Sequence, residues 1–105
     1  MIEITFNPKE MSVKVSGHAG QAEKGQDIVC SAVSILFYTL AQAVMDSMDA
    51  LETEPVIITD YGNGFVSCKP KKEYEGTIHR TYWTILTGFE LLAEGYKEYI
   101  SLVVL

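Results

Sequence analysis

A histidine and a cysteine stand close together in the segment GHAGQAEKGQDIVCSAVS (17–34). His18 lies in a glycine-bearing stretch, and Cys30 opens an apolar run. Cysteine attacks as the thiolate, which a nearby imidazole can generate by taking the thiol proton. The two residue types therefore suit a nucleophile and its general base. Residue types alone leave the pair undecided, because buried free cysteines and idle loop histidines are both common.

A helix predicted over 27–48 places Cys30 in its first turn. The dipole and free N–H groups at that end favour a thiolate and can hold an oxyanion. Asp27 is a suitable N-cap, since its carboxylate can accept bonds from those N–H groups. It could instead orient the imidazole as a third member of the site, although capping is the commoner role. Ser34, one turn beyond Cys30 on the same face, is either a polar partner of substrate or thiol or a small packing residue.

The histidine follows the first of two predicted hairpins. Alternating apolar and polar residues over 2–6 and 11–16 predict antiparallel strands with one buried face. The next segment, 17–26, has no apolar period, and we expect a mobile loop of the kind that often carries function. This loop runs from the strand end to the helix start, so it can bring His18 to the cysteine.

The rest of the chain adds a second hairpin, a second helix and a last strand. Asn63-Gly64, between strands predicted over 56–61 and 65–69, favours a type I′ turn. Apolar and aromatic residues then recur at intervals of four and three, which predicts one face of a second helix; they are Ile78, Tyr82, Ile85, Phe89, Leu92, Tyr96 and Tyr99. With a strand over 99–105, the order ββαββαβ predicts one domain (1–105) of class α+β. We expect a two-layer sandwich, with two helices packed on one face of a mostly antiparallel sheet.

Composition excludes several classes of protein. The formal charge of 8 − 14 = −6 argues against nucleic-acid binding or an anionic membrane surface. The basic stretch 69–80 is better interpreted as a solvated turn than as an RNA-contacting patch. Two cysteines make no disulfide framework and the N-terminus shows no secretory signal, so we expect a cytoplasmic protein with reduced thiols. The uncharged run 28–45 contains polar residues and lacks flanking basic ones, which argues against a membrane span.

The first helix is apolar over most of its circumference. Its polar stripe is limited to Ser31, Ser34, Tyr38 and Gln42. A sheet covers only one side of such a helix, so a partner subunit is a reasonable cover for another, and we expect a homodimer.

Zinc is the first alternative to a catalytic pair. The possible ligands are His18, Cys30, Cys68 and His79. They lack the short C-x-x-C or H-x₃₋₅-H spacing of structural zinc sites, so no metal and no other cofactor is expected. Cys68 is more simply a strand residue of the second hairpin.

The opening segment resembles the signature of the ribosomal-processing cysteine proteases, the Prp family. The matching motifs are Gly17-His18-Ala19 and Gly25-Gln26-Asp27-Ile28-Val29-Cys30-Ser31-Ala32-Val33-Ser34. The resemblance implies an endopeptidase in which His18 activates Cys30, while the role of Asp27 is not settled by it. The candidate substrate-contacting residues are Gly17, Ala19, Gly25 and Ser34.

The resemblance also implies a substrate and an assembly. Family members remove a short N-terminal extension from a large-subunit ribosomal protein, after an aromatic pair and before an alanine, and they form homodimers. Their histidine-bearing loop is thought to order on substrate, which suits the glycines of 17–26. The alternative is a non-catalytic ribosome-associated binding module of the same fold, with Cys30 structural and His18 idle.

Overall fold

The computed structural model describes residues 1–17, 26–60 and 62–105, and of Gln26 and Asp27 it describes the backbone alone. The main elements are β1 (Ile2–Asn7), β2 (Ser12–Ser16), α1 (Gln26–Asp46), β3 (Val56–Asp60), β4 (Asn63–Ser67), α2 (Glu75–Gly95) and β5 (Ile100–Val104). Short 3₁₀ helices, Met48–Ala50 and Lys72–Tyr74, follow α1 and precede α2. The predicted order ββαββαβ is confirmed.

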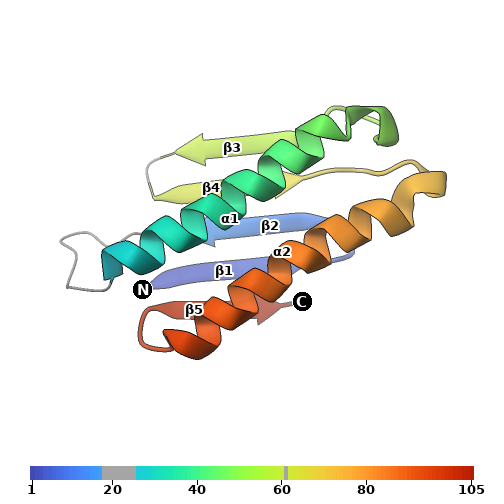
Figure 1. Cartoon of the computed structure of the whole chain (residues 1–105). Coiled ribbons are helices and arrows are strands. Elements are labelled where there is room, and N and C mark those ends of the chain that lie inside the picture. Colours follow the sequence, from blue (N-terminus) through green and yellow to red (C-terminus); the bar gives the residue numbers. More distant parts are fainter. Residues whose placement is uncertain (18–25, 61) are drawn as a thin grey trace.

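The five strands of the described chain form one sheet, in the order β3-β4-β2-β1-β5. Neighbouring strands are antiparallel except β1 and β5, which are parallel. Both helices lie on the same face of this sheet, as Figure 1 shows. The predicted α+β sandwich with a mostly antiparallel sheet is therefore confirmed, and the parallel pair arises because α2 carries the chain back before β5 begins.

The core lies between the sheet and the helices. In β1 the alternation predicted from sequence buries Ile2, Ile4 and Phe6, which are at most 2% exposed. The buried residues of α1 are Val29, Val33, Phe37, Leu40, Ala41 and Val44, and those of α2 are Ile78, Tyr82, Ile85, Leu86 and Phe89. The predicted face of the second helix is thus correct up to Leu92, which is partly buried against the core, whereas Tyr96 follows the end of α2 and is exposed.

The turn between β3 and β4 differs from the prediction. Asp60 pairs with Asn63 and Thr59 with Gly64, so Asn63-Gly64 belongs to β4 and does not form the turn. Gly62 supplies a positive φ of 77° there. The physical reason lies at Gly64, where a Cβ atom would stand 2.9 Å from Cζ of Phe37. Packing of α1 on the sheet requires a glycine at that strand position.

Among the described residues, one helix is long and apolar enough to cross a membrane, namely the part of α1 over Ile28–Asp46. Length and composition alone do not distinguish such a span from a core helix. Here one side of α1 packs against the sheet through Val29, Val33 and Leu40, each at most 2% exposed. This is the packing of a core helix.

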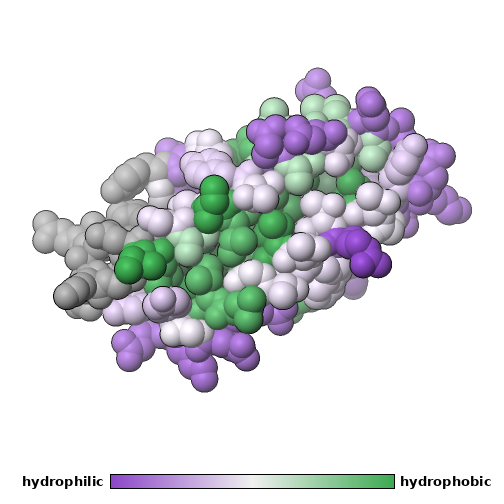
Figure 2. Space-filling model, viewed as in Figure 1, coloured by the Kyte–Doolittle hydropathy of each residue, from purple (hydrophilic) through white to green (hydrophobic). Residues whose placement is uncertain are grey.

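The outward side of the helix layer is nevertheless apolar. Ile28 and Ile35 on α1 and Leu91 on α2 are 63–64% exposed. The helices approach each other closely where Leu36 faces Gly88, one turn before Leu91. Figure 2 shows hydrophobic surface extending across both helices on this side. We call Ile28, Ile35 and Leu91 the outer helix patch.

Candidate active site

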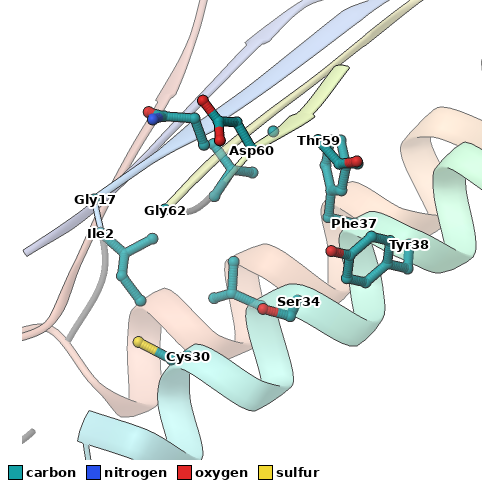
Figure 3. A pocket seen from close by; sticks show the side chains of 13 residues that line it. Ile2, Gly17, Cys30, Ser34, Phe37, Tyr38, Thr59, Asp60 and Gly62 are labelled. Atoms are coloured by element: carbon teal, nitrogen blue, oxygen red, sulfur yellow. The ribbon is translucent and has the colours of Figure 1, made fainter. Parts of the chain in front are cut away.

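Cys30 lines a cavity of about 540 Å³ between α1 and the sheet (Figure 3). Its side chain is partly buried and packs against the edge of the core. The backbone of α1 is already helical at Gln26, so Asp27 lies within the first turn and Cys30 just after it. The helix thus begins one residue earlier than predicted, a difference of the size that is usual at helix ends. The thiol is still close to the positive end of the helix dipole.

The cavity walls come from four parts of the fold. They are β1 through Ile2, the C-terminal end of β2 with the residue after it (Val15 and Gly17), α1 through Cys30, Val33, Ser34, Phe37 and Tyr38, and the β3–β4 hairpin through Thr59, Asp60, Gly62, Asn63 and Gly64. Most of these side chains are apolar, and Asp60 is the only lining residue of the described chain with a formal charge at neutral pH. Such a cavity suits an apolar peptide side chain beside the thiol.

Gly17 lines the cavity at a position where the backbone requires a glycine. Its φ of 91° is in the left-handed region, and a Cβ atom there would overlap the carbonyl oxygen of Met1. Only glycine satisfies both conditions without strain. The end of β2 can therefore approach Met1 closely beside the cavity.

The predicted site residues fall into two groups. Cys30, Ser34 and Gly17 line one cavity. His18, Ala19 and Gly25 lie outside the described residues, as does the side chain of Asp27. Their roles stay predictions.

Sequence reasoning missed several walls of the cavity. Tyr38 was visible only as part of a polar stripe, although its spacing of two helical turns from Cys30 is the signal that relates them. Thr59, Asp60 and Asn63 carry no local signal that relates them to Cys30, because they reach the cavity through the long-range pairing of β4 with β2.

The second cysteine occupies a different environment. Cys68 lines another cavity, together with residues of the β1–β2 turn and His79. The hydroxyl of Tyr82 donates a hydrogen bond to Cys68 Sγ at 3.4 Å. Burial raises the pKa of the Cys68 thiol, an effect that the bond from Tyr82 partly offsets. Cys68 is therefore a buried, protonated residue, and it directly follows β4 instead of lying within the strand as predicted.

The zinc alternative gains no support from this geometry. Cys30 and Cys68 line separate cavities. Within the described ranges no three histidine, cysteine or acidic side chains are grouped as a metal site would require.

An accessible thiol near a helix N-terminus, opening into an apolar cavity, is the arrangement of a thiol-dependent hydrolase. The family model "Cysteine protease Prp" matches residues 1–101. The chain therefore belongs to the Prp family of cysteine proteases. This membership does not favour the non-catalytic binding module.

Solved structures of other proteins have a similar fold. SMU.848 from Streptococcus mutans is 27% identical, with a TM-score of 0.75 over 100% of this chain and 94% of that one. The ribosomal processing protease Prp from S. aureus, in complex with a covalently linked product peptide, is 23% identical, with a TM-score of 0.73 over 100% of both chains. The same S. aureus enzyme with a substrate peptide is 24% identical, with a TM-score of 0.69 over 99% and 97%. No curated protein matches this sequence.

Proposed function

We propose that this cysteine protease is an endopeptidase that removes the N-terminal extension of a large-subunit ribosomal protein. The observation that carries the proposal is the exposure of Cys30 to the apolar cavity, in a chain of the Prp family. The similar S. aureus structures are of a ribosomal processing protease with peptides. Cleavage after an aromatic pair suits a cavity lined by Ile2, Val15 and Val33.

The chemistry follows from the two motif residues. His18 takes the thiol proton as Sγ of Cys30 attacks the scissile carbonyl carbon, and a tetrahedral oxyanion forms. The N–H groups near the start of α1 are suited to stabilise that oxyanion. The histidine then donates its proton to the departing amine, which leaves a thioester on Cys30. Water, deprotonated by His18, attacks the thioester and releases the carboxylate product and the thiol.

Three observations support His18 as the base. Gly17, which precedes it in sequence, lines the same cavity as Cys30. The only other histidine in the sequence, His79, lines a different cavity with Cys68. Family membership supports the same pairing, because the motif G-H-A is part of the resemblance.

The test uses a peptide that copies such an extension, with cleavage followed by mass spectrometry. Wild type is expected to cut it at the aromatic–alanine junction and Cys30→Ala to be inactive. His18→Ala should lower kcat by about 10²–10⁴-fold, the range of general base catalysis. His79→Ala and Cys68→Ala are matched controls that should retain the activity. No cleavage by wild type, or undiminished cleavage by Cys30→Ala, would overturn the proposal.

The pH dependence of alkylation tests the dyad separately. Iodoacetamide should react with Cys30 more slowly in His18→Ala than in wild type below neutral pH, because the base that removes the proton is missing. Identical pH profiles in the two proteins would eliminate His18 as the base.

Two roles of Asp27 are distinguishable by one variant. If Asp27 only stabilises the start of α1, in whose first turn it lies, Asp27→Asn should retain most of the activity, because an asparagine side chain can still accept bonds from free N–H groups there. If it orients the imidazole, the same variant should lower kcat with an unchanged free energy of unfolding. Replacement of Ala19, Gly25 or Ser34 as proposed substrate contacts should instead change KM, whereas replacement of Gly17 should also strain the fold.

We further propose a cytoplasmic homodimer. The outer helix patch supports it, because a self-complementary patch can meet its own copy across a two-fold axis. Reduced thiols, required by a nucleophilic Cys30, are maintained in the cytoplasm.

A further inference from the structure

Tyr38 shares one side of α1 with the nucleophile. Cys30, Ser34 and Tyr38 follow each other at intervals of four residues, and all three line the same cavity. Residues at this spacing form a continuous stripe along a helix. Eight residues at 1.5 Å each separate the ends of the stripe by about 12 Å along the helix axis.

The aromatic ring of Tyr38 is a preformed surface at the far end of the cavity. Its side chain is 54% exposed although it lines the wall. The neighbouring Phe37 ring meets it edge to face, at a centroid distance of 5.9 Å and an interplanar angle of 72°. Phe37 is in turn buried against Gly64 of β4. Figure 3 shows Phe37 and Tyr38 at the end of the cavity away from Cys30, with Ser34 between.

An extended peptide advances about 3.3 Å per residue. A peptide whose scissile carbonyl is at Cys30 and which runs beside α1 therefore reaches Tyr38 after three to four residues. Apolar side chains gain affinity by packing on an exposed aromatic ring. We infer that Tyr38 is a specificity-determining residue, which binds an apolar substrate side chain three or four residues from the scissile bond. This inference rests on the proposed endopeptidase function.

The experiment is an alanine scan of the cleaved peptide, on both sides of the cut, measured with four forms of the protein. With the wild-type enzyme, replacing one apolar peptide residue three or four positions from the cut with alanine should lower kcat/KM by about tenfold. In Tyr38→Ala the same replacement should have less than about a twofold effect, with KM raised for the parent peptide and kcat retained. Tyr38→Phe keeps the ring and should behave like wild type. Tyr74→Ala, at a tyrosine of similar exposure (43%) that does not line the cavity, is the matched control.

The outcomes separate the inference from the proposal on which it rests. Cleavage by wild type with an unchanged scan in Tyr38→Ala would overturn the inference alone. The inference would also be overturned if Tyr38→Ala changed the effect of replacing the peptide residues next to the cut instead of those three or four positions away. Absence of cleavage by wild type would overturn the proposed function together with the inference.

Discussion

The hydroxyl of Tyr82 donates a hydrogen bond to Sγ of Cys68 at 3.4 Å, deep in the core beneath α2. Tyr82 is 1% exposed and stacks on Phe6 at a centroid distance of 6.0 Å. Cys30, the other thiol, is partly buried and lines the candidate active site. The fold thus separates one structural thiol from one accessible thiol.

Selective alkylation follows from this separation. Native protein treated with iodoacetamide should take up a single label, on Cys30, because Cys68 is buried and its pKa is raised. Peptide mapping by mass spectrometry locates the label. Cys30→Ala should stay unlabelled until denaturant is added, whereas fast labelling of Cys68 in native protein would contradict the prediction.

Stability should fall in alkaline solution. Burial raises the pKa of Tyr82 and that of Cys68, whose ordinary value is 9.0. Both groups are neutral when protonated, so the unfolded chain loses these protons at lower pH than the folded chain does. Their stabilising contribution is full below pH 9 and decreases above it, by at most about 1.4 kcal/mol per pH unit for each group.

Urea unfolding at a series of pH values measures this slope. The double variant Cys68→Ala with Tyr82→Phe should be less stable at neutral pH and should lose less stability between pH 9 and 11. An equal slope in wild type and double variant would show that other groups cause the alkaline loss.

Gly64→Ala should destabilise the fold through Phe37. The added Cβ would lie 2.9 Å from Cζ of that ring, which is buried and cannot move without disturbing the core. Overpacking of this kind costs about 1–3 kcal/mol. Gly76→Ala is the control, since a Cβ there meets nothing within 4 Å and a helical alanine is favoured by about 0.5–1 kcal/mol. Chemical unfolding curves of the two variants should shift in opposite directions.

A charge in the outer helix patch should weaken self-association. Ile35→Glu would place a carboxylate at a side chain that is 63% exposed, where the proposed partner subunit would bury it. Sedimentation velocity should then show a monomer where wild type sediments as a dimer. Ile58→Glu, at an exposed position of β3, is the matched control. A dimer that survives in Ile35→Glu but dissociates in Ile58→Glu would place the interface at the sheet instead.

Much of the fold was predictable because its signals are local. Alternation in β1 and the apolar period of α2 identify each element and its buried face without reference to any other element. The pairing of β1 with β5 was not predictable in this way, because the partner strand lies at the opposite end of the chain. The place of Gly64 within β4 was missed for a related reason, since the role of Gly64 is set by Phe37 on another element.

The same distinction between local and long-range signals applies to the candidate site. The sequence by itself determined the motif, with its cysteine, histidine and aspartate, and the position of that cysteine near a helix start, because these depend on neighbours along the chain. Only the tertiary structure decided which side chains surround Cys30. The hairpin residues Thr59 and Asp60 reach the cavity through sheet pairing, and Tyr38 reaches it through the orientation of α1 on the sheet. That orientation results from the close packing of Phe37 over Gly64, which depends on the shapes of two surfaces far apart in the sequence.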